Sequence, residues 1–216
     1  MDKSFNPPTA DCRRCPRLVG FLEENRRLYP DFHNAPVDSF GQESARVLIV
    51  GLAPGLKGAN RTGRPFTGDF AGDVLYPALL RRNLAQGTYK AHRDDGLVLN
   101  DVRITNAVRC VPPQNKVTSF ETKTCGNFLK QEMSNMPNLK VVFALGSVAH
   151  GAVLSALEAK KSLYPFAHAT LHRLTFNNRP LVLVDSYHTS RYNINTGKLT
   201  EKMFEHALDV LEQALY

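Results

Sequence analysis

Four cysteines stand at positions that could hold one metal centre. Cys12 and Cys15 form a C-x-x-C near the N-terminus, and Cys110 and Cys125 lie far downstream with fourteen residues between them. In an intracellular chain, this number of cysteines suggests metal or redox chemistry before disulfides. Zinc is one candidate, but the wide second spacing fits the dispersed ligands of an iron–sulfur cluster better than a compact zinc ribbon. Four unlinked core thiols are the structural alternative.

A polar, glycine-rich loop follows the first strongly apolar run of the chain. Residues 47–50 read Val-Leu-Ile-Val, and Gly51 ends the run. Open α/β sheets bind ligands in loops of this kind, beyond the carboxyl ends of their strands. The glycines lack the spacing of a dinucleotide-binding loop, and Arg64 and Pro65 stand where a Walker loop needs lysine and a hydroxyl residue. The alternative is a solvated loop whose glycines serve turns, but distinctive residues are dense here: Asn60, Arg61, Arg64, Phe66 and Asp69.

Two further apolar runs lead into polar loops. Residues 102–108 precede a di-proline turn that carries Asn115, and residues 181–185 precede His188. An asparagine amide donates and accepts hydrogen bonds at once, so it can recognise a group that does the same. Without other information, a turn residue before the next helix is the favoured explanation of Asn115.

The pattern of apolar residues predicts the elements that position these loops. Strands are expected at 47–50, 102–108, 140–145 and 181–185, with 171–176 as a further candidate that turns at Asn177 and Asn178. Helices are expected between them, one of which begins with a capping box from Thr118 to Glu121. Such alternation predicts an α/β fold, a three-layer αβα sandwich with a central, mainly parallel four-stranded sheet. The loops that follow the strands then meet at one edge of the sheet.

Composition and charge limit the classes of partner and the cellular locations that the chain can have. The chain has 216 residues, a formal net charge of +7 and an isoelectric point near 9.3, which favours a polyanionic partner such as DNA. No stretch approaches the roughly 18 apolar residues of a membrane span, and the N-terminus has no apolar signal region. We therefore expect a cytoplasmic, nucleoid-associated monomer with one domain over residues 1–216.

The sequence resembles the family 5 (type B) uracil-DNA glycosylases of the uracil-DNA glycosylase superfamily. The resemblance rests on the segments 51–55 (GLAPG) and 58–69 (GANRTGRPFTGD), on two further motifs and on the four cysteines, and it extends from Cys12 to Thr200. It implies a monofunctional enzyme that flips uracil out of single- or double-stranded DNA and hydrolyses its glycosidic bond, starting base excision repair. It also implies activity on other deaminated bases such as hypoxanthine. A [4Fe-4S] cluster on Cys12, Cys15, Cys110 and Cys125 would tie the N-terminal segment to the core.

The resemblance also implies the roles of individual residues. Asp69 would orient the attacking water and face the cationic sugar, and His188 would donate a hydrogen bond to uracil O2. Asn115 would recognise N3–H and O4 of uracil, and Phe66 would stack on the base. Gly51 and Ala53 would also contact the substrate. Without the resemblance, Asp69 could simply cap the helix that follows, and Phe66 could simply be a core residue.

DNA contacts are expected from the basic and aromatic residues of the same loops. The last loop would supply the residues that enter or grip the strand. Proline often follows the motif histidine in the family, whereas this chain has Thr189, which predicts a looser loop. The expected DNA-binding residues are Arg61, Arg64, Lys116, Arg191, Tyr192, Asn193 and Lys198.

Two other functions are compatible with the residues alone. A non-enzymatic, DNA-binding iron–sulfur redox sensor would use the same basic surface and the same cysteines. A zinc-stabilised nucleotide-binding enzyme would use the cysteines for zinc. Release of free uracil with an abasic product would distinguish a glycosylase from the redox sensor. Zinc as the bound metal would identify the nucleotide-binding enzyme.

Overall fold

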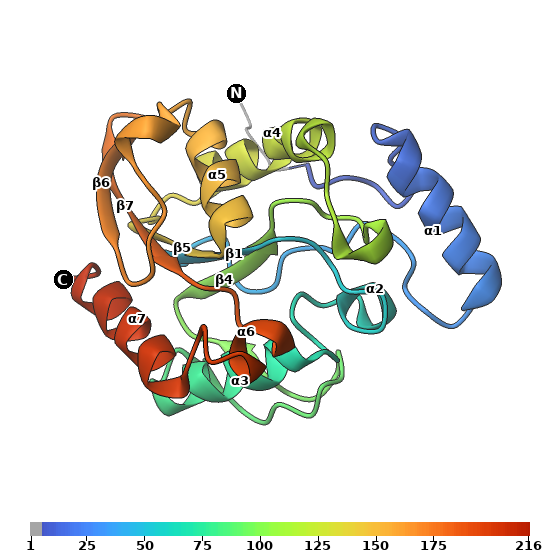
Figure 1. The fold of residues 1–216 in the computed structure, drawn as a ribbon, viewed down its shortest axis with the longest axis horizontal. Coiled ribbons are helices and arrows are strands. Elements are labelled where there is room, and N and C mark those ends of the chain that lie inside the picture. Colours follow the sequence, from blue (N-terminus) through green and yellow to red (C-terminus); the bar gives the residue numbers. More distant parts are fainter. Residues whose placement is uncertain (1–5) are drawn as a thin grey trace.

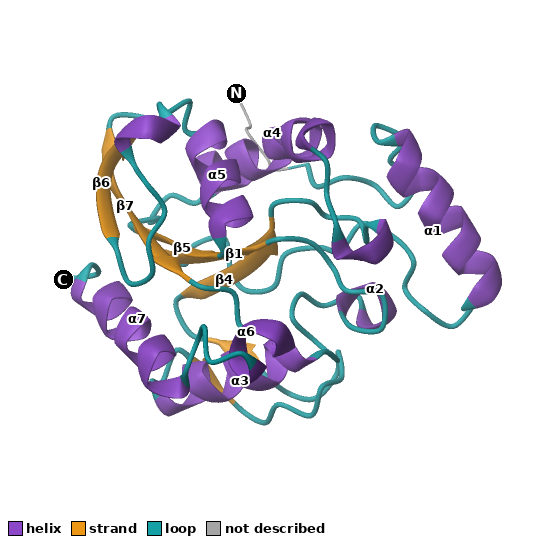
Figure 2. Ribbon diagram, in the orientation of Figure 1, coloured by secondary structure: helices purple, strands orange, loops and turns teal. Residues whose placement is uncertain are grey.

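The centre of the molecule is a sheet in the strand order β4-β1-β5-β7-β6 (Figures 1 and 2). In this computed structural model, residues 6–216 are described; residues 1–5, part of the stretch in which we expected no signal region, lie outside them. Four strands are parallel, and β6 pairs antiparallel with β7 at one edge. The strands are β1 Val47–Gly51, β4 Val102–Asn106, β5 Val141–Leu145, β6 Leu171–Phe176 and β7 Arg179–Ser186.

Strand β1 shows why the sheet has two apolar faces. Its residues are all buried, and successive side chains point to opposite faces. Val47 and Ile49 belong to the core cluster that includes the helices α3 Phe70–Arg81 and α7 Glu201–Gln213. Leu48 and Val50 belong to the cluster that includes α4 Ser119–Asn135 and α5 Ser147–Ala156. A helical layer therefore covers each face, as Figure 1 shows.

The remaining elements lie around this sandwich. Helix α1 Pro16–Leu28 lies at the periphery, and Leu18 packs against Val108, Cys125 and Phe128 of the core. The short elements are α2 Ala59–Thr62, α6 Arg191–Asn195, the 3₁₀ turns Pro113–Asn115 and Lys161–Leu163, and a small sheet of β2 Ala85–Gln86 and β3 Val98–Leu99. No helix in the described part of the chain is long and apolar enough to cross a membrane.

The predicted fold class is confirmed, with one strand added to the sheet. The α/β layers and the parallel strands agree with the expectation, and so does the capping box of Thr118 and Glu121. The sheet has five strands instead of four because residues 171–176 form a hairpin with β7. Asn177 and Asn178 both adopt positive φ, 49° and 59°, the backbone that a tight two-residue hairpin turn requires.

Candidate active site

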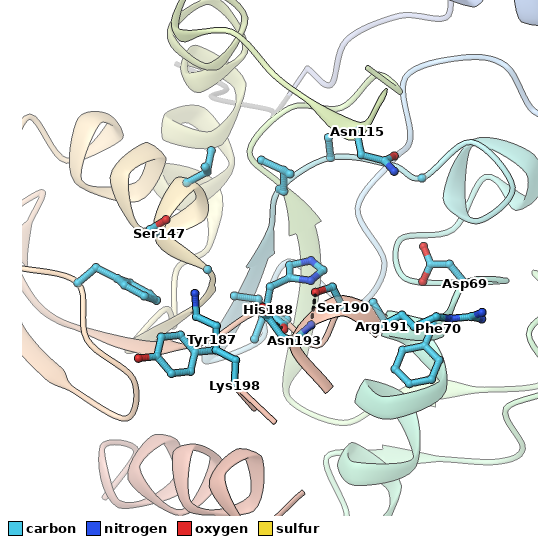
Figure 3. A pocket seen from close by; sticks show the side chains of 18 residues that line it. Asp69, Phe70, Asn115, Ser147, Tyr187, His188, Ser190, Arg191, Asn193 and Lys198 are labelled. Carbon is cyan, nitrogen blue, oxygen red and sulfur yellow. Dashed lines mark hydrogen bonds between the residues drawn. The ribbon is translucent and has the colours of Figure 1, made fainter. Parts of the chain in front are cut away.

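A cavity of about 490 Å³ opens beyond the carboxyl ends of the parallel strands (Figure 3). Strand register aligns these ends, since Gly51 lies beside Asn106 and Leu145 beside Ser186. The loops that follow the strands therefore converge, as expected for a parallel sheet. The structure brings three predicted residues to this cavity from segments far apart in the sequence: Asp69, Asn115 and His188.

Asp69 both caps a helix and lines the cavity. It is the N-cap of α3, and its Oδ1 accepts a hydrogen bond of 3.1 Å from the backbone N–H of Gly72. Its other carboxylate oxygen lies toward Gly58, where an added Cβ would come within 2.4 Å of it. Burial raises the pKa of Asp69 above its ordinary value, although the backbone hydrogen bond opposes this. The capping interpretation and the catalytic one are thus compatible.

His188 follows β7 and carries a ring without a hydrogen-bond partner among the described residues. The ring stacks on Phe66, with centroids 5.9 Å apart and an interplanar angle of 26°. Burial lowers the pKa of His188 to about 4, so the imidazole is neutral at pH 7. A neutral imidazole has one N–H to donate, which suits an acceptor on a substrate.

Asn115 lies on another side of the same opening (Figure 3). It ends the 3₁₀ turn Pro113–Asn115, which Pro112 precedes, and both Gln114 and Asn115 have positive φ, 54° and 56°. Asparagine tolerates this backbone better than most residues. The amide of Asn115 is exposed and free to pair with a ligand.

Phe66 and Gly51 lie beneath the cavity and do not line it. Phe66 is only 5% exposed, and a Cβ at position 51 would come within 2.5 Å of its ring. Glycine at 51 therefore permits the ring to pass under the strand end. Ala53 lines the cavity, as does Phe70, over which the Arg191 guanidinium lies at 5.2 Å from the ring centroid.

The expected DNA-binding residues divide into three groups. Arg191, Asn193 and Lys198 line the cavity. Outside it, Tyr192 is 73% exposed, and Arg61 and Lys116 are also exposed. Arg64 is the exception, because it is turned into the interior.

Arg64 holds the loop together instead of facing solvent, which corrects its expected role at DNA phosphates. Its side chain is nearly buried and donates two hydrogen bonds, of 2.8 and 2.7 Å, to the buried carboxylate of Asp95. It also donates to Thr67 at 2.8 Å and lies over the ring of Phe40. Burial alone would raise the pKa of Asp95, but hydrogen bonds from Arg64 and from backbone N–H groups outweigh it and hold that pKa below its usual range.

Replacing Arg64 is therefore expected to lower stability instead of DNA affinity. Arg64→Met would leave the Asp95 carboxylate buried without its partner, and we expect a loss of about 3–5 kcal/mol in the free energy of unfolding. Urea denaturation measures this loss. The matched variant Arg61→Met, at an exposed arginine of the same loop, is expected to keep its stability. An Arg64 variant as stable as the wild type but weaker in DNA binding would contradict the interior role.

The four cysteines lie around one small cavity away from the cavity that holds Asp69. Cys12 and Cys15 precede α1, Cys110 follows β4 and Cys125 lies within α4, so the cavity joins the N-terminal segment to the core. Burial raises the pKa of Cys15 to about 11 and raises that of Cys110 as well, with the neighbouring cysteines adding to both shifts. Thiols with such pKa values need a strong cationic partner to become thiolates.

The same helices are also joined by an ion pair. Arg17 of α1 donates hydrogen bonds of 2.8 and 2.7 Å to the carboxylate of Glu121 at the start of α4. The first turn of α1 is thus placed against the helix that carries Cys125.

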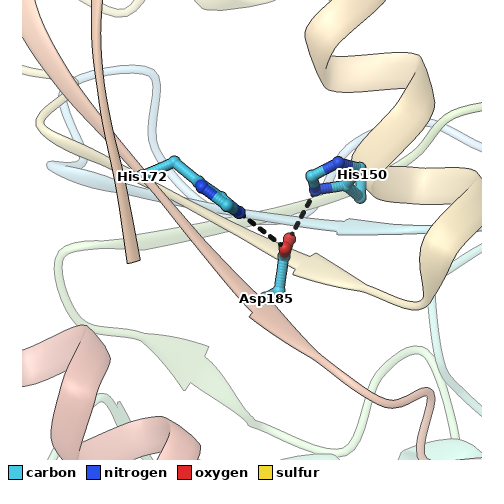
Figure 4. Close-up of side chains that lie close together, drawn as sticks. All are labelled: His150, His172 and Asp185. Atoms are coloured by element: carbon cyan, nitrogen blue, oxygen red, sulfur yellow. Dashed lines mark hydrogen bonds and ion pairs between the residues drawn. The ribbon is translucent and has the colours of Figure 1, made fainter. Parts of the chain in front are cut away.

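A buried group that the sequence analysis did not identify supports one wall of the cavity that holds Asp69. Figure 4 shows Asp185 of β7 between His150 of α5 and His172 of β6, at 2.8 and 3.1 Å. Phe166, which lines the cavity, packs edge-on against His150. The three residues are far apart in the sequence, so no spacing pattern predicts that they form a group. Their hydrogen bonds join three elements directly behind the loop of His188.

Other lining residues were also missed from the sequence. Tyr187 and Ser190 lie within two residues of His188, so their closeness to a candidate catalytic residue was a usable signal. Ser147 and Phe166 come from segments without any motif, and only the fold brings them to the cavity.

Comparisons with known proteins identify the family of the chain. Residues 39–212 match the family model described as the uracil DNA glycosylase superfamily. A type-5 uracil-DNA glycosylase of Thermus thermophilus is 42% identical over 220 residues, which cover 99% of this chain and 97% of that protein. Type-5 uracil-DNA glycosylases of Mycobacterium leprae and Pyrobaculum aerophilum are 40% and 39% identical, over 93% and 88% of this chain and 90% and 83% of their own lengths.

Proposed function

Because the chain belongs to the uracil DNA glycosylase superfamily, we propose that it excises uracil from DNA as a uracil-DNA glycosylase. The observation that carries this proposal is the meeting of Asp69, Asn115 and His188 at one cavity. An enzyme of this kind takes the target nucleotide out of the stack and into a pocket before it breaks the glycosidic bond. The similarity to enzymes over nearly the whole chain gives no support to the alternative of a non-enzymatic redox sensor.

Recognition of the base would depend on Asn115. Uracil presents a donor at N3–H and an acceptor at O4, and an amide can pair with both. Cytosine presents the opposite pattern, so the same amide orientation rejects it. The positive φ of Asn115 and the two prolines before it hold the turn that presents the amide.

Bond cleavage would depend on two fixed electrostatic groups. As the bond breaks, positive charge develops on the sugar and negative charge on the departing base. The Asp69 carboxylate would face the sugar and orient the attacking water, while neutral His188 would donate its N–H to uracil O2. Neither role requires a covalent intermediate, so we propose a monofunctional enzyme that leaves an abasic site without cutting the strand.

The direct test is release of free uracil from a labelled duplex with a single U·G pair. The purified protein is expected to leave an abasic site that breaks only after treatment with base or heat. DNA binding without uracil release would overturn the proposal. Matched substrates with uracil in single strands, or with hypoxanthine in its place, test the broader substrate range that we propose.

Asn115→Ala is expected to lower kcat/KM for uracil by about 10- to 100-fold, since the polar edge of the base would be left unpaired in the pocket. The matched control is Gln114→Ala, because residue 114 has the same positive φ but does not line the cavity. Single-turnover rates over a range of enzyme concentrations measure both. Equal losses in the two variants would show that the turn matters and the amide does not.

We propose that the cysteine cavity holds a [4Fe-4S] cluster. The donor set fits, because four thiols surround one cavity and each can serve as a cluster ligand. Tetrahedral zinc is the alternative centre for four thiolates, and the metal content of the purified protein decides between the two. A cluster would hold the N-terminal segment against the loop after β4 and helix α4, so that the whole chain forms a single domain.

The remaining features of the proposal concern DNA and assembly. Arg191, Asn193 and Lys198 at the cavity would grip the strand around the flipped nucleotide, with exposed Arg61, Lys116 and Tyr192 beyond them. We propose a monomer that works on chromosomal DNA in the cytoplasm, which suits its net charge of +7.

A further inference from the structure

Thr189 connects the loop of His188 to the helix that begins at Asp69. Its side chain is fully buried, and its Oγ1 donates a hydrogen bond of 3.2 Å to the backbone carbonyl of Ala71. Ala71 lies in the first turn of α3, two residues after the N-cap Asp69. One hydroxyl thus joins the loop of His188 to helix α3, across 118 residues of sequence.

The backbone is what places the His188 ring. Among residues 6–216, no group hydrogen-bonds the ring, and its aromatic contact is the stack on Phe66. The backbone on either side is anchored, however, and before the ring the Tyr187 N–H donates a 3.1 Å hydrogen bond to His168 Nδ1. The His188 carbonyl accepts a 2.8 Å hydrogen bond from the Asn193 amide, and the next residue is Thr189. The Asn193 bond is internal to the loop, so it cannot fix the loop relative to α3.

A second contact between the loop and α3 is weaker. The Arg191 guanidinium lies over the Phe70 ring, but Arg191 is exposed and has a long, flexible side chain. Thr189 has one rotatable bond before its hydroxyl and is enclosed by protein. Its hydrogen bond is therefore the more restrictive link between the two catalytic loops.

We propose that Thr189 is a positioning residue whose hydroxyl sets the place of His188 relative to Asp69. The inference rests on the proposed function, in which these two side chains act on opposite ends of the breaking bond. A misplacement of about 1 Å can cost roughly 100-fold in rate even when binding is unaffected. Threonine in place of proline predicts a looser loop, but the hydrogen bond from Thr189 to Ala71 restrains it instead.

Isosteric variants separate the hydroxyl from the shape of the side chain. Thr189→Val keeps the volume and loses the donor, whereas Thr189→Ser keeps the donor. Thr105→Val is the matched control. Thr105 lies on β4 and is also fully buried, and its Oγ1 accepts a 3.1 Å hydrogen bond from the Ser39 hydroxyl. We expect Thr189→Val to lower kcat about 10- to 100-fold at little-changed KM, and Thr189→Ser and Thr105→Val to stay near wild type.

A readout without substrate keeps the inference separate from the proposed activity. Ring resonances of His188 in long-range ¹H–¹⁵N spectra are expected to shift in Thr189→Val and not in Thr189→Ser or Thr105→Val. If the wild-type protein releases no uracil, the proposed function fails and these spectra still decide the role of Thr189. Unmoved His188 resonances in Thr189→Val, or equal losses of kcat in the valine and serine variants, would overturn the inference.

Discussion

Asp69→Asn is expected to slow uracil excision by roughly 100- to 1,000-fold while the protein stays folded. The carboxylate is the only charge of the proposed mechanism that faces the developing sugar cation, and removal of one preorganised electrostatic group typically costs this much. Asparagine is an equally good N-cap, so the bond from the Gly72 N–H to the side chain of residue 69 is retained. Because burial raises the pKa of Asp69, the neutral amide is not expected to destabilise the fold.

Single-turnover excision from a U·G duplex, measured across pH, checks this prediction. The wild-type rate is expected to fall as acid protonates Asp69, at a pH above the ordinary carboxyl pKa of 3.8, since burial raises the value. Asp69→Asn is expected to lose this dependence. The control is Asp73→Asn, at an exposed acid in the first turn of the same helix. A rate for Asp69→Asn within a few-fold of wild type would remove the proposed role.

His188 adds a pH dependence of stability with a defined sign. Its pKa is about 4 in the fold against 6.5 as the ordinary value, so the unfolded chain binds more protons between these pH values. Folding stability from this group is therefore complete above about pH 6.5 and is lost as pH falls toward 4. Over the same range the His188 imidazole stays neutral until the pH approaches 4.

Cys110→Ser is expected to abolish cluster binding and to lower stability by several kcal/mol, or roughly 10 °C in Tm for a chain of this size. Four cysteines from the N-terminal segment, the loop after β4 and helix α4 line the cavity. Loss of one ligand would release the constraint among all three segments. Iron content, visible absorption and thermal unfolding measure the outcome, and the wild-type protein is expected to be brown.

The matched control is Leu18→Ala, which removes packing beside the same cavity without removing a ligand. Leu18 is 1% exposed, so we expect a loss of about 2–5 kcal/mol from the cavity it leaves. That variant is expected to keep its iron, which separates ligation from packing. A colourless wild-type protein that contains zinc, or a Cys110→Ser variant that keeps full iron content, would contradict the assignment of the cluster.

The sequence predicted the elements whose local signals agree with their final packing. The run at residues 47–50 became a buried strand, and Asp69, Asn115 and His188 each follow a strand whose end faces the same edge. Parallel topology then brings these residues together without any knowledge of side-chain contacts. The fifth strand was only a candidate, because two asparagines signal a turn but do not show which sheet the hairpin joins.

Pairings across long sequence distances could not be predicted. Arg64 looked like a phosphate ligand until Asp95, 31 residues away, was seen to hold it in the interior. Thr189 looked like a loss of rigidity, because its acceptor lies 118 residues away. The roles of Arg64 and Thr189 depend on which partner the fold places beside them, and the residue type alone does not indicate that partner.

The ends of the central sheet bear on self-association. At one end, a bridge between Phe40 and Ile104 covers β4, with two backbone hydrogen bonds of 2.9 and 2.7 Å. At the other, the edge strand β6 exposes Arg173 to solvent. A covered edge and a charged edge both disfavour the addition of a strand from a second molecule, which would otherwise nucleate aggregates.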